Sequence, residues 1–478
     1  MARTRLAMRP DRLAWSAACC ALLAACNHAP AYRQPELPVP QAFEASDDDG
    51  RRLAGEIGWQ QFFGDPQLKY LIAEALAHNR DLAASVARIE QARALYRIQE
   101  AARLPQLDAG AAAARSQTPL STIDPGLPNN NASVTFNQYS VQAAVASYEL
   151  DFWGRVRNLN EAARSRYLAS IESDRAFRLI LVGNVAATYY AIRAGEEGIL
   201  LARRTLEARQ YALQIASLRL DAGVTSSVDY DQAAILVTQA QTQLAELLRT
   251  TQQRRNQLLV LVGKPLDGPL PAARSIDDAG QFGTLDAGLP SALLVNRPDI
   301  VEAELQLRAA DADIGAARAA FFPRVALTGN LGYASGELGN LLNSNHLAWT
   351  IGGAVSLPIF DGGQRQAQLD ATLARRDELV ALYQRSVQTA FTEVADALVA
   401  RQRYQQQIEV QEAAVLAQRR LAEVAQLRYD NGISIYLEVV DARRNLFSTE
   451  QQMIQLRATA LQNGVSLYLA LGGGPAGP

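Results

Sequence analysis

The sequence is poor in the residues that bind metals or carry out covalent chemistry. The whole chain of 478 residues includes only three cysteines, three histidines and three methionines. The histidines, His28, His78 and His346, are dispersed and have no cysteine companion at the spacing of a metal site. No catalytic constellation emerges from the remaining residues. We therefore expect no enzyme activity, no catalytic residue, no bound metal and no diffusible cofactor.

Long hydrophobic runs are also absent after Ala25. No later segment contains eighteen consecutive apolar residues, which excludes a membrane-spanning helix. A chain of this kind enters a membrane only as strands. The formal charge is -3 for the whole sequence and -6 without the segment 1–25, which contains four arginines and one aspartate. Such a weak acidic balance argues against nucleic acid as a partner.

The N-terminus has the features of a bacterial export signal. Four arginines precede about a dozen apolar or small residues, a segment too short to span a bilayer permanently. The segment contains Cys19 and Cys20 and ends in Leu23-Ala24-Ala25-Cys26, which resembles a lipobox. This resemblance implies a signal peptide over residues 1–25 and a covalent lipid on Cys26. The residue after Cys26 is Asn27, and not the aspartate that commonly holds lipoproteins at the inner membrane. An ordinary signal followed by a chance cysteine is the alternative.

The rest of the sequence consists of two copies of one unit. Three glycines of the first copy align with three glycines of the second at one constant difference in residue number, and this alignment runs without a gap over about 110 residues. A second, slightly larger offset aligns the segment before them. The aligned pairs are Gly154 with Gly363, Gly223 with Gly432 and Gly263 with Gly472 at the first offset, and Asp81 with Asp299 and Pro105 with Pro323 at the second. The chain is therefore not built from two unrelated domains.

Each copy contains two segments in which apolar residues alternate with small or polar ones. We predict strands at about 106–116 and 138–150 in the first copy and at about 324–333 and 349–358 in the second. In the last of these, Trp349, Ile351 and Val355 share one face. This alternation is typical of a strand between lipid and water.

Four strands are too few to form a closed sheet, and an open edge is not tolerated in lipid. The chain therefore forms oligomers, or the strands belong to a small soluble sheet. Five aromatic residues near the predicted strand ends form either interfacial girdles or parts of a core: Tyr139, Tyr148, Trp153, Tyr333 and Trp349.

A long helical segment follows each pair of strands. These segments predict helical hairpins at 152–262 and 363–471, which turn at Gly223 and Gly432. Gly195 and Gly198 are expected to break the first long helix locally. The expected domains are a signal peptide (1–25), a lipid-anchored N-terminal and equatorial segment (26–81), repeat 1 (82–263), an equatorial linker (264–298), repeat 2 (299–472) and a tail (473–478).

Five further motifs are specific in combination with the lipobox. They are Trp59-Gln60-Gln61-Phe62-Phe63-Gly64-Asp65-Pro66, Glu149-Leu150-Asp151-Phe152-Trp153-Gly154, Asn296-Arg297-Pro298-Asp299-Ile300, Phe321-Phe322-Pro323 and Leu437-Glu438-Val439-Val440-Asp441-Ala442-Arg443-Arg444. Together they resemble outer membrane efflux proteins of the TolC class, in the NodT-type lipoprotein branch with its OprM-like outer membrane factors of RND efflux systems. The resemblance implies a mixed α/β membrane protein of the cell outer membrane. Its expected form is a homotrimeric, 12-stranded transmembrane β-barrel, four strands per chain, continuous with a long periplasmic α-helical barrel.

The resemblance also implies a function and partners. The expected function is passive export of small molecules such as drugs, and the expected partners are a periplasmic adaptor (membrane fusion) protein, an inner-membrane RND transporter and outer membrane lipid. The alternatives are the outer membrane channel of a type I protein secretion system and a structural periplasmic coiled-coil lipoprotein. Met453 is the one methionine after Ala25, so a methionine-lined path for copper or silver lacks support.

Two sets of residues match functional positions of this family. Leu437, Asp441 and Arg444 match a periplasmic gate, and their spacing places them on one face of a helix. An ordinary surface ion pair between Asp441 and Arg444, worth under about 1 kcal/mol, is the alternative. The first-copy counterparts are Val228, Gln232 and Ile235, so the pair is absent there. The turns at Gly223, Val224, Gly432 and Ile433 match adaptor-docking tips, and simple helix termination is the alternative reading of the glycines.

Overall fold

The structure is a computed structural model that describes residues 28–37, 39–40, 57–119, 133–266, 268–278, 281–283, 294 and 297–473. The expected signal peptide and Cys26 lie outside the described residues. The chain divides into two compact units, each of which takes segments from both sequence repeats. Unit 1 comprises Met1–Pro35, Glu90–Ala169 and Glu304–Leu382, and unit 2 comprises Glu36–Ile89, Ser170–Ala303 and Tyr383–Pro478.

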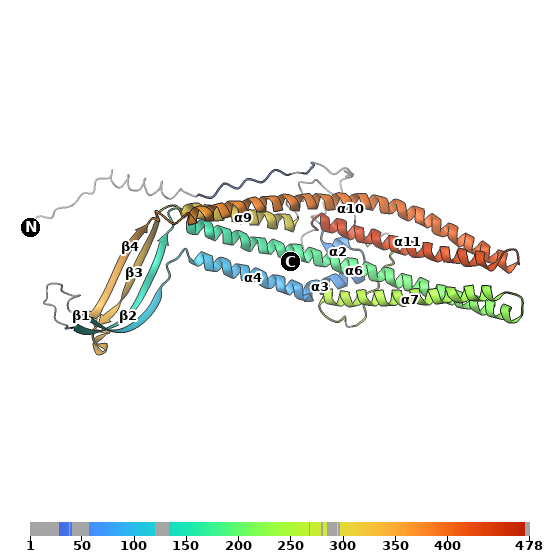
Figure 1. Cartoon of the computed structure of the whole chain (residues 1–478), viewed down its shortest axis with the longest axis horizontal. Helices are drawn as coiled ribbons and strands as arrows, with labels where there is room; N and C mark the ends of the chain where they lie inside the picture. Colours follow the sequence, from blue (N-terminus) through green and yellow to red (C-terminus); the bar gives the residue numbers. More distant parts are fainter. Residues whose placement is uncertain are drawn as a thin grey trace, which may run out of the picture. The chain divides into compact units, whose positions relative to one another are not determined.

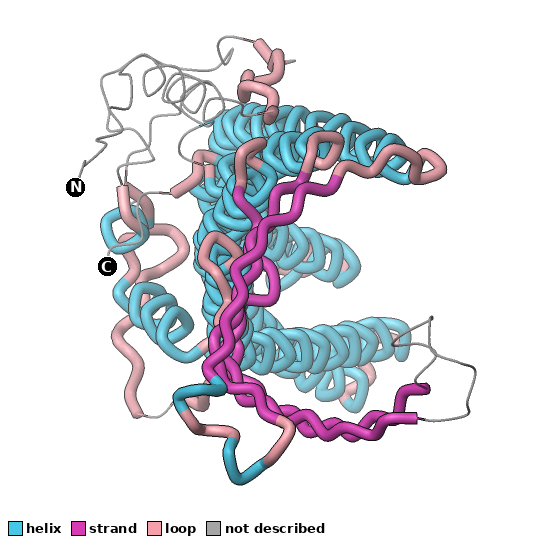
Figure 2. The backbone as a smooth tube through the Cα atoms, turned by 90° about the vertical axis from the view of Figure 1, so that its left-hand side faces the viewer, coloured by secondary structure: helices cyan, strands magenta, loops and turns pink. Residues whose placement is uncertain are grey.

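Unit 1 contains a four-stranded antiparallel sheet in the order β1-β2-β3-β4 (Figure 1). The strands are β1 (Asp108–Pro119), β2 (Ser133–Leu150), β3 (Arg324–Ser335) and β4 (Leu347–Ser356). Pairing of β2 with β3 joins the hairpin of the first copy to that of the second, with Val141 opposite Tyr333. The register shifts between Val145 and Tyr148, and Figure 2 shows that the strands curve along their length.

The hairpin of the first copy is longer than its side-chain alternation predicts. β2 begins at Ser133 rather than at about 138, and it pairs with β1 as far as Pro119. Val134 and Phe136 also alternate with polar residues, but in the opposite phase to Tyr139 and Val141, so the side-chain pattern breaks at Asn137-Gln138 while the backbone ladder continues through it. Tyr139 consequently lies within β2 and not near a strand end as expected.

The alternation predicted for the second copy is confirmed by the strand register. Leu331 lies opposite Trp349, and Gly329 lies opposite Ile351. Trp349 and Ile351 are 66% and 79% exposed in the single chain. Exposed large apolar side chains that share one face of a sheet mark a surface that contacts lipid or another protein chain.

The helices of the two copies correspond to each other at the two offsets that align the sequence repeats. α6 (Arg155–Asp221) and α10 (Gln364–Asp430) contain 67 residues each, and their first residues are repeat counterparts. α7 (Ser227–Val262) and α11 (Tyr436–Ala470) follow them and form the returning arms of two hairpins (Figure 1). α4 (Arg80–Ala101) and α9 (Pro298–Ala319) also begin at counterpart positions. None of the helices in the described ranges combines the length and the hydropathy needed to cross a membrane.

The expected break at Gly195 and Gly198 is wrong, because α6 is continuous through both positions. A Cβ atom at Gly195 would clash with the hydroxyl of Thr251 on α7. Glycine at this position therefore lets the two helices of the hairpin approach each other closely.

Aromatic rings join three distant segments in the core of unit 2. Phe62 belongs to the short helix α2 (Trp59–Phe62), and its ring stacks on Tyr468 of α11 and on Phe282, with centroid distances of 4.5 and 5.0 Å. The Gly64 N–H donates to the carbonyl of Gln281 at 2.8 Å. The segment that follows α2 and the described part of the linker therefore pack together on the second helical hairpin.

Asp65 fixes the start of α3 (Pro66–His78) and is fully buried. Its carboxylate accepts the Gln67 N–H at 2.8 Å, as an N-cap residue does. The same carboxylate accepts the Tyr189 hydroxyl of α6 at 2.7 Å and the Arg274 N–H of the linker at 2.9 Å. Burial and the hydrogen bond to Asp65 raise the pKa of Tyr189. One side chain thus connects α3, α6 and the linker.

Candidate functional site

The two helical hairpins turn with the same backbone geometry. Gly223 and Gly432 each have a φ of 71°, in the left-handed region that glycine adopts without strain. Gly223 and Val224 donate their N–H groups to the carbonyls three and five positions earlier, both at 2.9 Å. Gly432 and Ile433 repeat this pattern at 2.9 and 2.8 Å. This Schellman pattern satisfies the last carbonyls of α6 and α10, so helix termination accounts for both glycines.

Apolar side chains at the two turns are exposed. Val224 is 72% exposed and Ile433 is 68% exposed. Val228 and Ile435, just after the turns, are 57% and 66% exposed. Helix termination does not require these side chains, and their exposure makes each tip a candidate contact surface.

A contact between Arg219 and Tyr429 joins the two hairpins near their tips. The Arg219 guanidinium donates to the Tyr429 hydroxyl and lies 4.9 Å from the centroid of its ring. The ring centroid of Tyr429 in turn lies 5.2 Å from that of Tyr436 at the start of α11. Arg219 aligns with Arg428 at the same repeat offset as the glycines of the turns, but the alignment does not indicate that Arg219 contacts the second copy.

The three gate candidates lie on one face of α11, as their spacing predicts. Leu437 is 42% exposed. Asp441 Oδ1 lies 3.1 Å from Arg444 Nη2 within one chain, and both side chains are about half exposed. An ion pair in this setting contributes under about 1 kcal/mol to the stability of a single chain. The geometry fits an ordinary surface pair as well as a gate, so the gate stays a prediction.

The first copy has uncharged residues at the three equivalent positions of its returning helix. Val228 and Ile235 of α7 are 57% and 56% exposed. Gln232 stands at the position of Asp441. The ion pair is therefore a property of the second hairpin alone.

The first described residues of the chain pack against unit 1 close to the sheet. The His28 ring stacks on Phe322 at 4.5 Å, and Phe322 stacks on Trp153 at 4.8 Å. Trp153 Nε1 donates to the carbonyl of Pro323, the residue just before β3, at 2.7 Å. Arg318 Nη1 donates to the His28 carbonyl at 3.2 Å. Cys26 thus closely precedes a segment that is held beside the end of the sheet.

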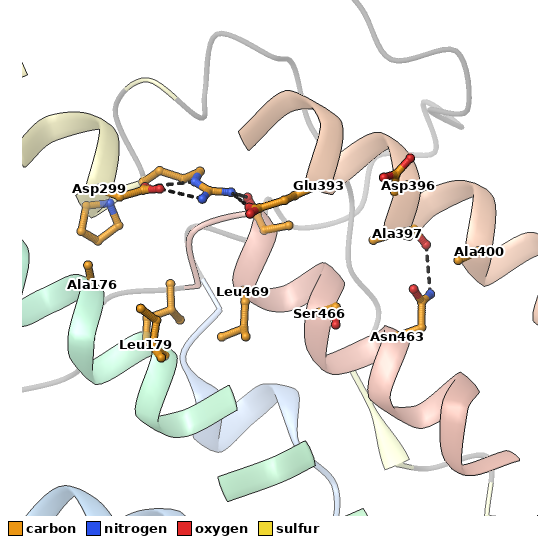
Figure 3. A pocket seen from close by; sticks show the side chains of 14 residues that line it. Ala176, Leu179, Asp299, Glu393, Asp396, Ala397, Ala400, Asn463, Ser466 and Leu469 are labelled. Atoms are coloured by element: carbon orange, nitrogen blue, oxygen red, sulfur yellow. Dashed lines mark hydrogen bonds and ion pairs between the residues drawn. The ribbon is translucent and has the colours of Figure 1, made fainter. Parts of the chain in front are cut away.

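A pocket of about 610 Å³ in unit 2 surrounds a buried arginine of the Asn-Arg-Pro-Asp-Ile motif. Arg297 is 8% exposed and donates to both oxygens of Asp299 (3.0 and 2.7 Å), to Glu393 (2.7 Å) and to the Ala470 carbonyl (3.0 Å). Figure 3 shows Asp299 and Glu393 converging from α9 and α10. Burial lowers the pKa of Arg297, but the hydrogen bonds to Asp299 and Glu393 outweigh it and the net direction is upward.

The repeat counterpart of this arginine makes an equivalent contact. Asn79 aligns with Arg297, and its Nδ2 donates to the Leu261 carbonyl at 2.8 Å. Leu261 aligns with Ala470, the residue whose carbonyl Arg297 binds. Each copy therefore uses the residue before its α4 or α9 helix to bind the end of the returning helix. The motif was visible in the sequence, but its structural role in tying these helices together was not.

Comparison with known proteins identifies the family. The family model described as "Outer membrane efflux protein" matches residues 71–264 and 289–473. The solvent efflux pump outer membrane protein SrpC of Pseudomonas putida is 40% identical over 459 residues, which cover 95% of this chain and 96% of SrpC. The cation efflux system protein CusC of Escherichia coli K12 is 38% identical, with 95% of this chain and 98% of CusC covered.

The fold agrees with that of solved channel structures. The open state of the MtrE outer membrane channel of Neisseria gonorrhoeae matches with a TM-score of 0.85 and 35% identity, covering 94% of this chain and 98% of MtrE. The four-stranded sheet argues against the alternative of a purely coiled-coil lipoprotein. The chain therefore belongs to the outer membrane efflux protein family, and it is an outer membrane channel of an efflux pump with a periplasmic helical part, and not an enzyme.

Proposed function

We propose that three copies of this chain assemble into the exit duct of a tripartite pump for small organic molecules. The observation that carries the proposal is the sheet of unit 1. Among the described residues, its outer strands β1 and β4 pair on one side only, and Ile351 and Val355 leave its apolar face exposed. Unpaired edges are not stable in lipid, and edge-to-edge association of three sheets removes all of them.

The apolar face gives a matched pair of variants that tests this assembly. Ile351→Asp places a charge on the apolar face, and Thr350→Asp places the same charge on the opposite face of β4. We expect Ile351→Asp to abolish the heat-sensitive trimer band in outer membrane fractions on mild gels, and Thr350→Asp to retain it. A stable monomer in the unmodified protein, or equal behaviour of the two variants, would contradict the proposal.

The tips supply the surface for a periplasmic adaptor protein, and an inner-membrane RND transporter supplies the energy. The exposed Val224 and Ile433 side chains support docking at both tips. Relatives are named for the efflux of solvents, toluene, antibiotics and cations. Because Met453 is buried and is the one methionine after Ala25, organic molecules fit this chain better than soft metal cations. Toluene and antibiotic sensitivity, without copper sensitivity, is expected in a deletion strain, and the reverse pattern would refute the cargo class.

The face formed by Leu437, Asp441 and Arg444 acts as the periplasmic gate. In a trimer this face occurs three times, so an apolar ring lies beside rings of opposite charge. The pairing of Asp441 with Arg444 at 3.1 Å supports a charged constriction, since the acidic and basic rings then neutralise each other and stay compact.

A lipid on Cys26 tethers the chain to the outer membrane. The docking of His28 beside the end of the sheet supports this proposal, because it would hold Cys26 close to the membrane surface. We expect Cys26→Ser behind an ordinary cleavable signal to lose labelling with a palmitate analogue and still to yield functional trimers. Persistent labelling would refute lipidation at Cys26, and absence of trimers would show that the lipid is essential.

A further inference from the structure

A second cleft in unit 2, separate from the gate and the tips, has the size of a small-molecule site. It lies among α6, α10 and α11 and has a volume of about 960 Å³. Its walls combine charged side chains with apolar ones, among them Leu201, Val415, Leu446 and Phe447. The cleft therefore offers a surface that favours a hydrocarbon group.

A buried arginine without a counter-ion faces this cleft. Arg209 is 7% exposed, and its Nη1 donates to the Leu236 carbonyl at 2.8 Å. Its guanidinium lies 5.6 Å from the centroid of Phe447, and its Nε is buried without a hydrogen-bond partner. No carboxylate of the described residues forms an ion pair with it, and burial lowers the pKa of Arg209. A buried charge that lacks a counter-ion is unfavourable, so an anion in the cleft would stabilise it.

Two more arginines that line the cleft have no carboxylate partner in the described part of the chain. Arg443 donates to the neutral Gln426 amide oxygen at 2.7 Å, and Arg204 forms no ion pair there. The other two arginines of the lining are neutralised: Arg419 pairs with Glu450 at 2.7 Å, and Arg457 pairs with Glu412 at 3.1 Å and with Asp277. The cleft is lined by five arginines and four carboxylates in all, so one negative charge would balance it.

We propose that this cleft binds a single-chain amphiphile with one carboxylate, a molecule of the fatty-acid class. The carboxylate binds at Arg209, and Arg204 and Arg443 are the other lining arginines that have no carboxylate partner in the described residues. Guanidinium groups bind carboxylates through paired hydrogen bonds. The chain lies along the apolar wall beside Phe447. Such a ligand touches α6 of the first hairpin and α10 and α11 of the second, so it links the two hairpins. The proposal does not depend on the gate or on adaptor docking.

The test uses the full-length protein in nanodiscs of zwitterionic lipid and three probes that separate charge from chain. Octanoate has both groups, acetate has only the carboxylate, and octanol has only the chain. Saturation-transfer NMR, corrected with empty nanodiscs, measures binding of each. We expect octanoate to bind at least tenfold more tightly than either acetate or octanol. Equal binding of octanol and octanoate would overturn the proposal.

Three variants locate the site. Arg209→Gln introduces the residue found at the repeat counterpart, Gln418, and Arg204→Gln changes an exposed side chain. Each is expected to weaken octanoate binding at least tenfold. Arg249→Gln on α7, which removes an exposed pair with Glu246, is expected to leave it unchanged. If Arg209→Gln fails to assemble, the Arg204→Gln result decides. Octanoate affinity that is unaffected by Arg204→Gln, or equally reduced by Arg249→Gln, would refute the site.

Discussion

The two copies of the repeat share one backbone plan but have different side chains where function is expected. Glycines at matching positions have similar left-handed φ angles: 75° and 90° at Gly154 and Gly363, 71° at both Gly223 and Gly432, and 82° and 90° at Gly263 and Gly472. The returning helices nevertheless present Val-Gln-Ile in one copy and Leu-Asp-Arg in the other. Helix ends and turns have thus been kept, while exposed faces have diverged.

The same contrast applies inside the scaffold. The contact that ties the returning helix is made by a neutral amide at Asn79 and by a charged guanidinium at Arg297. The charged version needs Asp299 and Glu393 as partners, which enlarges a single hydrogen bond into a network. Substitution of Arg297 and substitution of Asn79 should therefore lower the free energy of unfolding by different amounts.

The largest expected effect is therefore a loss of unfolding free energy. We expect this loss to be larger for Arg297→Ala than for Asn79→Ala. Removing one partner of a buried charge pair costs about 3–5 kcal/mol, but Asp299 and Glu393 are almost half exposed, so we expect a loss nearer to about 2 kcal/mol. Asn79→Ala loses hydrogen bonds to Leu261 and Leu82 and should cost about 1–2 kcal/mol. Thermal unfolding of trimers measures both. A greater loss for Asn79→Ala would contradict the assigned difference between the copies.

The next effect concerns the turns, where the copies are expected to behave alike. Gly223→Val and Gly432→Val force a branched residue into the left-handed region, at a cost of about 1–2 kcal/mol. Nothing crowds either position, so the strain is in the backbone alone. We expect each variant to reduce site-specific cross-linking to the adaptor while trimers persist. Gly223→Asn and Gly432→Asn are the controls, since asparagine tolerates this region. Undiminished cross-linking in both valine variants would count against docking at the tips.

The gate prediction expects different channel conductances for equivalent substitutions in the two copies. Asp441→Ala should raise the single-channel conductance in planar bilayers, because the charged ring loses its acidic partner, whereas Gln232→Ala at the equivalent place should not. A bias of about 1 kcal/mol changes the ratio of closed to open channels by a factor of roughly five.

The reverse substitution sharpens this comparison. Gln232→Asp combined with Ile235→Arg builds the missing pair into the first copy and should lower the conductance. Identical conductance in Asp441→Ala and the unmodified channel would leave Asp441 and Arg444 as an ordinary surface pair.

The smallest effect depends on pH. Burial, followed by the nearby carboxylate of Asp277, raises the pKa of Glu197, whereas the second copy has Gln406 at this position. When folding raises the pKa of a carboxyl, the folded protein becomes less stable as the pH rises through that pKa. Glu197→Gln removes this carboxyl, so it should stabilise the protein at pH 8 by less than about 1 kcal/mol. At pH 4, where the carboxyl is protonated, the substitution should have no effect. Glu196→Gln, which removes pairs with Arg193 and Arg255, should not stabilise it. Apparent melting temperatures at both pH values provide the comparison.

Periodicity and repetition in the sequence were sufficient for the order of elements and for most helix ends. α10 begins at Gln364, one residue after the predicted start of the hairpin, and ends at Asp430, two residues before the predicted turn at Gly432, because a proline-free helical run is bounded by glycines on both sides. The start of β2 was missed because its alternation changes phase between Phe136 and Tyr139, whereas backbone pairing continues through this point. Gly195 was misread because a glycine that permits close helix packing has the same local signature as one that breaks a helix.

Side-chain contacts across the repeats were beyond the reach of the sequence. Helical spacing placed Leu437, Asp441 and Arg444 on one face, since that depends only on local geometry. The contact of Arg219 with Tyr429 and the isolation of Arg209 depend on how the two hairpins pack, which periodicity does not specify.

The two outer strands of the sheet come from different repeats, and this has a genetic consequence. In the proposed trimer, β1 of each chain meets β4 of its neighbour, so every subunit is needed at two junctions. A subunit damaged at either edge spoils any ring that includes it. With equal synthesis of sound and damaged chains, only about one-eighth of rings would be free of damaged subunits, so such alleles should be dominant over the intact gene.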